Sequence, residues 1–376
     1  MGKIKKVFLV VNTLTLGGAE AQALIMAREI NKMNGYKPVI IGLVSGGPLV
    51  TILQKEAIEY IIIGVDFAKF NKNIVQKMGE LYKVYSLLKK EKPYVIISST
   101  YYPNLVMSLV SFLISQSRFF WYQVGKEWEM PFSKLQKLAQ ACTSNFLANS
   151  EDVKGYMVER LNIFPEKIQV IPNVFLERFA QTNKVFWYQK WQLNDDNFVF
   201  ILISNFFRSK DQMSAVCAMK SIVHQYPNVR LILAGYPPEP HYLNSIKAKV
   251  IDEQLYNHVL FTESTPDVFG LLQIAHVGVF TSVKKHTEGS PTIIQEYMHA
   301  QLPTIVSDIP CNRETFEGID EALFYEPENV SDLSEKMRYC VENKNMLSII
   351  GQKNKARVDS MYNPTRLNEI LKGIVK

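Results

Sequence analysis

Two carboxylates stand close together in the stretch HTEGSPTIIQEYMHAQLPTIVSD, which runs from residue 286 to residue 308. Glu288 precedes Pro291, and Glu296 follows it. If both glutamates lay in one helix, the intervening positions would turn the chain by roughly 800° and advance it by about 12 Å. They therefore cannot act as an adjacent acid and base pair. We instead expect a helix that opens at Pro291, with Glu288 just before it and Glu296 on its inward face.

The start of this expected helix offers hydrogen-bond donors to an anion. Gly289 and Ser290 follow the apolar segment VGVFTS, and Thr292 and Ile293 supply backbone amides that have no partner in the first helical turn. A negative group there gains from hydrogen bonds and from the helix dipole. Glu296 is suited to accept two hydroxyls of a ribose. Its structural alternative is a buried salt bridge, and that of the preceding glutamate is a partner for the helix dipole.

Two cations follow another apolar segment, FVFILIS, in the stretch ISNFFRSKDQM from residue 203 to residue 213. The carboxyl ends of parallel strands form the edge at which α/β sheets bind ligands. Arg208 and Lys210 would neutralise a diphosphate there, the role that metal ions have elsewhere. In isolation, a solvated basic loop explains the pair better. Together with the helix start and the two glutamates, the pair indicates a nucleoside diphosphate site.

A glycine pair follows the first apolar segment, in NTLTLGGAEAQAL from residue 12 to residue 24. Gly17 and Gly18 would let the backbone approach an anionic group at a helix N-terminus. The alternative is a tight turn with no ligand. The spacing differs from GxGxxG, which argues against a nicotinamide or flavin enzyme.

Short β-branched segments alternate with amphipathic helical stretches along most of the chain, a pattern typical of parallel sheets. The pattern restarts near residue 198, and 376 residues exceed one typical core. We therefore expect an α/β fold with two Rossmann-like doubly wound domains that face a cleft. The first spans 1–175 and the second 176–356. A C-terminal helix in 357–376 would pack back on the first domain, and 173–197 is the expected linker.

Composition describes an ordinary globular protein, with 47% hydrophobic and 21% charged residues. The apolar stretch 104–114 is too short for a membrane span. We interpret the N-terminal MGKIKKVFLVVNT as a strand, not a signal peptide. The four cysteines are widely spaced and form no metal or redox pair, which favours a cytoplasmic setting.

Charge is unevenly distributed. Residues 1–185 hold 23 basic and 14 acidic side chains, a net charge of +9, whereas the remainder has a net charge of −3. Chance and solvated helix faces explain the asymmetry as well as an anionic partner does. Since no nucleic-acid motif is present, a membrane surface is the preferred partner, and we expect the basic N-terminal domain to make this peripheral contact.

The chain resembles the retaining glycosyltransferases of the GT-B fold, family 4. That family carries a block E-G-x-P, then an apolar stretch, then E-A-x-A-x-G-x-P-V-V-x-S-D; this chain has EGSPTIIQEYMHAQLPTIVSD. GGAE, IPNV, RSKD and LILAG also occur in the family's order. The resemblance implies that Glu296 holds the ribose, Arg208 and Lys210 the diphosphate, and Glu288 the transferred sugar. It also implies that the glycine pair approaches the phosphate.

Two features depart from the family pattern. Asn205 occupies the place of an arginine in many members, although a variant with the arginine at the position of Arg208 occurs. Many members have a histidine near the reacting sugar in the first domain, whereas all six histidines here lie from His224 onward. The acceptor-side group is therefore not identified by the resemblance.

The corresponding loop of the first domain reads YQVGKEWEMPF. Gln123, Lys126 and Glu127 are the candidates there for contacts with the acceptor or the sugar. Trp121 and Trp128 would either stack on an acceptor sugar or pack in the core.

These features predict transfer of a sugar from a UDP- or GDP-sugar to an acceptor hydroxyl with retention of configuration. We expect no cofactor and no metal, since no DxD-like acidic pair follows a strand. The expected acceptor is a lipid-linked glycan or growing surface polysaccharide at the cytoplasmic face of the membrane, with no nucleic-acid partner. Two alternatives stay open: another GT-B enzyme, such as a nucleotide-sugar epimerase or inverting transferase, and a non-catalytic sugar-nucleotide binding protein.

Overall fold

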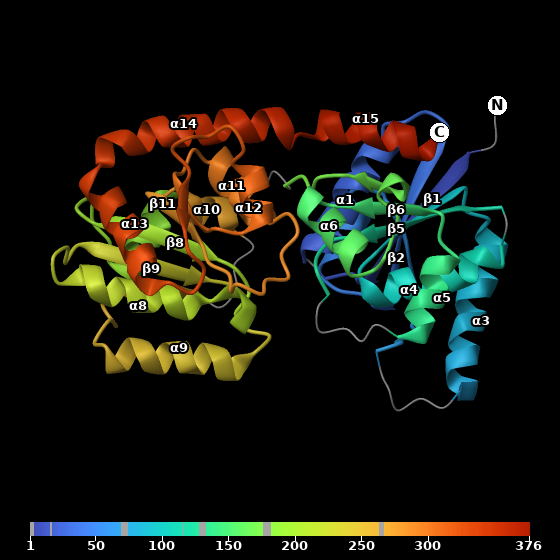
Figure 1. The fold of residues 1–376 in the computed structure, drawn as a ribbon, viewed down its shortest axis with the longest axis horizontal. Helices are drawn as coiled ribbons and strands as arrows, with labels where there is room; N and C mark the ends of the chain where they lie inside the picture. The colour runs from blue at the N-terminus through green and yellow to red at the C-terminus, as the bar shows by residue number, and fades with distance from the viewer. Residues whose placement is uncertain are drawn as a thin grey trace. The chain divides into compact units, whose positions relative to one another are not determined.

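The computed structural model describes residues 4–15, 17–68, 74–114, 116–127, 133–175, 182–262 and 267–376. The chain forms two compact units. Unit 1 comprises Met1–Leu176, Thr287–Ser290 and Tyr362–Lys376, and unit 2 comprises Glu177–His286 and Pro291–Met361. Each unit is built around one parallel β-sheet (Figure 1).

The sheet of unit 1 has the strand order β3-β2-β1-β4-β5-β6-β7, and every pair is parallel. Its strands are β1 (Lys5–Thr13), β2 (Tyr36–Ser45), β3 (Glu59–Ile62), β4 (Val95–Ser99), β5 (Arg118–Gln123), β6 (Asn145–Ala148) and β7 (Ile168–Val170). Its helices are α1 (Gly18–Asn31), α2 (Leu49–Lys55), α3 (Ile74–Glu91), α4 (Tyr101–Phe112), α5 (Lys134–Ala141), α6 (Glu151–Glu159), the 3-10 turn η1 (Pro165–Lys167) and α15 (Pro364–Val375).

Helices cover both faces of this sheet, which explains why its central strands β1 and β4 carry consecutive apolar residues. Val7 and Leu9 of β1 belong to a buried cluster with α1, α2 and α15. Phe8 and Val10, which point to the opposite face, belong to a second cluster with α3, α4, α5 and α6. Successive residues of one strand therefore serve two separate cores.

The sheet of unit 2 has the order β10-β9-β8-β11-β12-β13, again all parallel. Its strands are β8 (Phe198–Ile203), β9 (Val229–Ala234), β10 (Val259–Thr262), β11 (Val277–Phe280), β12 (Thr304–Ser307) and β13 (Leu323–Tyr325). Its helices are α7 (Lys184–Trp191), the 3-10 turn η2 (Arg208–Lys210), α8 (Gln212–Val223), α9 (Pro240–Asp252), α10 (Val268–Leu272), α11 (Thr292–His299), α12 (Pro310–Thr315), α13 (Val330–Glu342) and α14 (Lys344–Met361).

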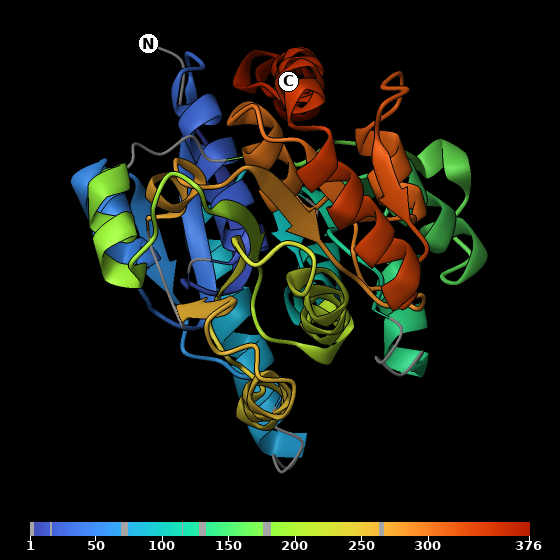
Figure 2. The same ribbon diagram turned by 90° about the vertical axis from the view of Figure 1, so that its left-hand side faces the viewer.

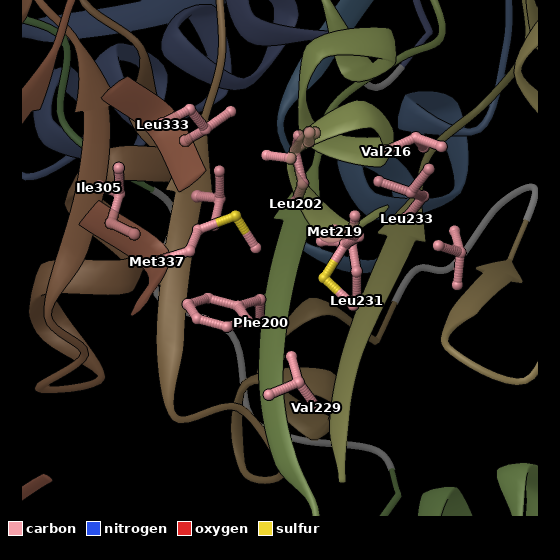
Figure 3. Packing of buried hydrophobic residues seen from close by; sticks show 14 of the residues in the cluster. Phe200, Leu202, Val216, Met219, Val229, Leu231, Leu233, Ile305, Leu333 and Met337 are labelled. Carbon is pink, nitrogen blue, oxygen red and sulfur yellow. The ribbon is translucent and has the colours of Figure 1, made fainter. Parts of the chain in front are cut away.

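The same two-sided burial holds in unit 2. Phe200 and Leu202 of β8 cluster with Met219 of α8 and Met337 of α13 (Figure 3). Helix α9 contributes to the same cluster, and Figure 2 shows α8 and α9 nearly end-on. Val199 of β8 instead joins a cluster with α7, α10 and α11. Burying one such side chain fully stabilises the fold by roughly 1.5–3 kcal/mol.

The predicted linker 173–197 is wrong in part. Its residues Lys184–Trp191 form α7, which Asn183 caps by accepting a hydrogen bond from the Phe186 amide at 3.1 Å. Trp187 is buried in unit 2. The aromatic residues in this stretch are thus a helix face that packs, and not a spacer. Residues 176–181 lie outside the described part of the chain.

The C-terminal segment divides between the units. Residues 357–361 end α14 in unit 2, whereas α15 packs on α1 in unit 1. Leu367 and Leu371 join the cluster around α1, and the Asn368 side-chain amide donates to the Glu29 carbonyl at 3.3 Å. Within the described residues, no helix is both long and apolar enough to cross a membrane.

Candidate active site

The order of strands in each sheet reverses at one point. The reversal lies between β1 and β4 in unit 1 and between β8 and β11 in unit 2. In open parallel sheets, ligands bind beyond the carboxyl ends of the strands that flank this switch point. The loops after β1, β8 and β11 are therefore the parts of the fold best placed to bind a ligand.

Arg208–Lys210 forms a 3-10 turn in the loop after β8. The Thr281 hydroxyl donates to the Lys210 carbonyl at 2.5 Å, and the Ser282 hydroxyl donates to the Ser209 carbonyl at 3.2 Å. Since Thr281 and Ser282 follow β11, these bonds join the loops on the two sides of the switch point. The predicted pair of cations thus lies where a doubly wound sheet binds ligands.

Aromatic rings lie beneath both cations. The Arg208 guanidinium carbon is 6.0 Å from the centre of the Tyr242 ring, and the Lys210 Nζ is 5.4 Å from that of Phe280. Cations at such distances from a ring face are attracted to its negative face. The Arg208 backbone N–H also donates to the Glu239 carboxylate at 3.3 Å. Backbone contacts hold the turn, from which the exposed Arg208 and the half-buried Lys210 extend over the two rings.

The predicted helix after β11 is α11, and it begins at Thr292. Pro291 is its N-cap residue, in an extended conformation with no side-chain cap, so the first-turn amides of Thr292 and Ile293 keep their donor capacity. The expected inward direction of Glu296 is wrong, because Glu296 is only partly buried. The buried face of α11 consists of Ile294, Gln295, Tyr297 and Met298. Glu296 instead shares a face with Thr292, four residues earlier.

Contacts of Tyr297 determine which face of α11 is buried. The Tyr297 side chain is fully buried, and its hydroxyl accepts a hydrogen bond from the Ile203 amide at 2.7 Å. A Cβ at Gly278 would lie 2.5 Å from the Tyr297 ring, so the close approach of the ring to β11 requires glycine at this position. Burial raises the pKa of the Tyr297 hydroxyl, which stays neutral. These contacts anchor α11 to the end of β8 and to β11.

Asn205, at the place of the arginine in many family members, has a structural contact. Its side-chain oxygen accepts a hydrogen bond from the Tyr236 amide at 3.3 Å and so connects the loops after β8 and β9. The backbones are close here, since a Cβ at Gly235 would lie 2.0 Å from the Ser204 carbonyl oxygen. Arg208, in the same loop, is the arginine nearest to Asn205 in the sequence.

In unit 1, Gly17 is the N-cap residue of α1, and its backbone is extended. The Glu20 carboxylate accepts hydrogen bonds from the backbone N–H groups of Gly17 and Glu20 and from the Thr15 hydroxyl. Burial raises the pKa of Glu20. An anionic group already occupies the helix start, and a ligand phosphate would have to share these donors. Sequence reasoning missed Glu20, although a glutamate three residues after an N-cap is a capping signal.

The segment Thr287–Ser290, which contains Glu288, belongs to unit 1. The Lys126 backbone N–H donates to the Thr287 carbonyl at 3.0 Å, and the Asn173 side-chain amide donates to the Ser290 carbonyl at 3.0 Å. Both ends of the segment are therefore held by unit 1. Asn173 belongs to the IPNV motif. That motif contributed to the family resemblance, but it did not predict a contact between Asn173 and Ser290.

Gly289 lies against Asn149 at the end of β6. A Cβ at Gly289 would lie 2.4 Å from the Asn149 side-chain oxygen, so the close approach requires glycine. Asn149 is 1% exposed, and its amide nitrogen donates to the Val124 carbonyl at 2.9 Å. Sequence reasoning missed Asn149, since the residue is distant in the chain and belongs to no motif.

Gln123 and Trp121 are both fully buried at the end of β5. The Trp121 indole donates to the Gln123 side-chain oxygen at 2.9 Å, and the Gln123 amide donates to the Gly125 carbonyl at 2.7 Å. Of the two alternatives for Trp121, core packing holds. Trp128 lies outside the described residues.

Lys126 and Glu127 differ in their surroundings. The Lys126 ammonium pairs with Asp152 at 2.7 Å, which gives it a structural partner. The Glu127 carboxylate accepts hydrogen bonds from the Gln123 side chain and from the backbone N–H of Tyr101 at the start of α4. Burial nevertheless raises the pKa of Glu127 to about 7. Glu127 is thus a carboxyl group that changes charge near neutral pH.

Glu127→Gln is expected to flatten the pH dependence of stability. The folded pKa of about 7 lies above the unfolded value of 4.5, so the folded chain retains a proton that the unfolded chain releases. Stability from this group is present below pH 4.5 and falls as pH rises to 7, by roughly 3 kcal/mol in all. Thermal unfolding at pH 5 and pH 8 should show the variant gaining several degrees on the wild type at the higher pH. The exposed Glu166→Gln serves as control; equal pH profiles for wild type and Glu127→Gln would contradict the assignment.

Family models match both halves of the chain. Residues 16–175 match the family described as Glycosyltransferase Family 4, and residues 183–357 match that described as Glycosyl transferases group 1. These ranges follow the two units closely, with the second match beginning at α7.

Named relatives cover much of the chain at low identity. The capsular polysaccharide biosynthesis glycosyltransferase CapM of Staphylococcus aureus is 21% identical over 79% of this chain and 80% of its own length. The Escherichia coli UDP-Gal:alpha-D-GlcNAc-diphosphoundecaprenol alpha-1,3-galactosyltransferase is 25% identical over 66% of this chain and 67% of its own length.

Solved structures resemble the whole chain. Anabaena Alr3699/HepE in complex with UDP and glucose has a TM-score of 0.83 and 18% identity, and the match covers 99% of each chain. A glycosyltransferase from Rickettsia africae has a TM-score of 0.83 and 19% identity, covering 100% of this chain and 98% of that one. With both halves matched in the expected order on two doubly wound units, the chain belongs to glycosyltransferase family 4 and has the GT-B fold.

Proposed function

We propose that this glycosyltransferase moves a sugar from a UDP- or GDP-sugar to an acceptor hydroxyl with retention of the anomeric configuration. The observation that carries the proposal is the turn Arg208–Lys210, hydrogen-bonded across the switch point of the unit 2 sheet. The two cations follow β8 and the amide-rich start of α11 follows β11, the strands on the two sides of the switch point, and together these groups suit a diphosphate. Glu296, on the same face as Thr292, suits the ribose hydroxyls.

The reaction breaks the bond between the anomeric carbon and the diphosphate oxygen. The acceptor oxygen bonds to that carbon on the same face, and its proton passes to the departing diphosphate. Arg208 and Lys210 stabilise the negative charge that builds up on the leaving group, which is commonly the largest catalytic contribution. In this proposal Glu288 contacts the transferred sugar, Gly17 and Gly18 approach the phosphate, and neither a metal ion nor another cofactor takes part.

The proposed acceptor is a membrane lipid-linked glycan or growing surface polysaccharide. The name of the Escherichia coli relative specifies a diphosphoundecaprenol-linked sugar, and that of CapM specifies capsular polysaccharide biosynthesis. We propose that the enzyme works at the cytoplasmic face of the membrane, with Gln123, Lys126 and Glu127 on the acceptor side. Among these, Glu127 has the best support, since its carboxyl group titrates near neutral pH.

The direct test is the anomeric configuration of the product, followed by proton NMR with UDP-glucose, UDP-galactose and GDP-mannose as donors. Retention with one donor is the expected result. Inversion would assign the enzyme to a different mechanism, and epimerised free donor to a nucleotide-sugar epimerase. Nucleotide binding without turnover on any lipid-linked acceptor would identify a binding protein.

Glu296→Ala is expected to weaken nucleotide binding by roughly 10- to 100-fold, because hydrogen bonds to a charged group contribute about 1.5–3 kcal/mol. Thermal unfolding with UDP, GDP, ADP and CMP measures this effect. A nucleotide at a hundred times its dissociation constant adds roughly 2.7 kcal/mol of stability. One diphosphate should raise the midpoint of the wild type, and the same concentration should raise it less in the variant. The exposed Glu335→Ala is the control; an undiminished shift in Glu296→Ala would remove Glu296 from the site.

A further inference from the structure

Helix α3 carries an apolar stripe on its solvent side. Val75, Met78 and Tyr82 are 74%, 62% and 68% exposed. Their spacing of three and four residues places them on one face of the helix. The opposite face, with Val84 and Leu88 fully buried, packs on the sheet of unit 1. An exposed stripe of this kind marks a surface that meets something less polar than water.

The neighbouring helices continue this apolar character. Leu135 and Leu138 of α5 are 48% and 54% exposed, and Phe112 and Leu113 at the end of α4 are 65% and 70% exposed. Helix α4 contacts both α3 and α5, and Figure 1 shows the three side by side. All three send buried residues into the same cluster on one face of the sheet. The outer sides of α3 and α5 therefore face away from that sheet in a common direction.

Basic side chains accompany the apolar ones. The lysines of the three helices are Lys77, Lys83, Lys89, Lys90, Lys134 and Lys137. Their acidic residues are Glu80 and Glu91, and Glu91 pairs with Lys6 at 2.6 Å. Lys83 and Lys90 lie along one flank of the α3 stripe. The excess of positive charge noted for residues 1–185 is thus partly gathered around exposed apolar side chains.

We propose that the outer faces of α3 and α5, with the end of α4, form a surface that docks on an anionic lipid bilayer; it is called the α3–α5 surface below. Its biological purpose rests on the proposed lipid-linked acceptor. Apolar side chains enter the boundary between headgroups and acyl chains, while lysines reach anionic phosphates. A second copy of the chain fits less well, since a symmetric contact would place lysine-rich patches against one another. Because the lysines of this surface complement anionic lipid phosphates, the membrane is the partner that fits it best.

The test is flotation with vesicles that contain no acceptor, so it does not depend on sugar transfer. The full chain should float with phosphatidylcholine vesicles that contain about 30% phosphatidylglycerol, and weakly with phosphatidylcholine alone. About 0.5 M NaCl should release it, because salt shortens the Debye length to a few ångströms. Absence of binding, or equal binding to neutral and anionic vesicles, would overturn the proposal.

Two variants locate the surface. Met78→Ser with Tyr82→Ser is expected to lower the partition coefficient by about tenfold or more, through lost apolar insertion. Lys83→Glu with Lys90→Glu should lower it by at least about 25-fold on anionic vesicles alone, since each lysine near the surface contributes about a factor of five. The matched control in unit 2 is Ile251→Ser with Tyr256→Ser, whose native side chains are 67% and 63% exposed.

Further measurements distinguish a failure of this membrane-docking proposal from a failure of the proposed function. Every variant should keep the wild-type unfolding midpoint and nucleotide-induced shift, and should transfer sugar normally to a short-chain acceptor in detergent-free solution. Normal vesicle binding by both α3 variants, or loss of binding in the control, would overturn the assignment of the surface. A change from dimer to monomer in the variants would identify a second copy as the occupant instead. Absence of sugar transfer with intact vesicle binding would count against the proposed function alone.

Discussion

Lys210→Ala is expected to lower the turnover number by about 10²–10³-fold, the cost of removing one fixed group that stabilises a developing anion. The Lys210 ammonium lies 5.4 Å from the Phe280 ring centre, and the Lys210 carbonyl accepts a hydrogen bond from the Thr281 hydroxyl. The backbone bond persists in the alanine variant, so the turn should keep its shape. The change then removes charge without removing the loop.

Steady-state kinetics with saturating acceptor measures this effect. The Michaelis constant for the donor should change much less than the turnover number, because charge builds on the diphosphate as the bond to the sugar breaks. Lys210→Arg should recover part of the rate. The control is Lys220→Ala in α8, where the native ammonium pairs with Glu253 at 2.5 Å on the surface. A turnover number for Lys210→Ala within a few-fold of the wild type would refute the role.

Two doubly wound sheets were predictable because the central strands carry apolar residues at successive positions. In β1, Val7 and Leu9 serve one core and Phe8 and Val10 the other, so the pattern that identified a parallel sheet reflects two-sided burial. The position of Arg208–Lys210 was predictable for a related reason. A loop after a central strand must lie at the carboxyl edge of the sheet, whatever its side chains do.

The phase of α11 was not predictable from its own residues. Its eight positions contain both Glu296 and Tyr297, and either could have faced inward. The choice depends on Gly278 and Ile203, which receive the Tyr297 ring and hydroxyl. These partners belong to β11 and β8, so their contact with the helix follows from strand register and is absent from local periodicity.

The contacts of the segment Thr287–Ser290, which contains Glu288, could not be predicted from the sequence either. Asn173 bonds to Ser290 across 117 positions, and Asn149 touches Gly289 across a similar separation. Neither asparagine is special in type or spacing. Helix α7 was missed for another reason, because its aromatic residues have weak amphipathic order and resembled an irregular linker. Such features depend on tertiary contacts.

Gly289→Ala is expected to lower catalytic efficiency by about 100-fold, the usual scale for displacing a reacting group by about 1 Å. The added methyl would lie 2.4 Å from the Asn149 side-chain oxygen, well inside contact distance. Asn149 cannot easily turn away, since it is 1% exposed and its amide is bonded to the Val124 carbonyl. The segment must therefore shift, and Glu288, the adjacent residue, shifts with it.

A double-mutant cycle distinguishes this displacement from general damage. Asn149→Ala removes the obstructing oxygen, so Gly289→Ala should cost much less in that background than in the wild type. The nucleotide-induced rise in unfolding midpoint should persist in every variant, because Arg208, Lys210 and Glu296 lie in unit 2. Gly155→Ala, where a methyl meets no atom within 4 Å, is the control in unit 1. Equal costs of Gly289→Ala in both backgrounds would show that the contact with Asn149 does not set the position of Glu288.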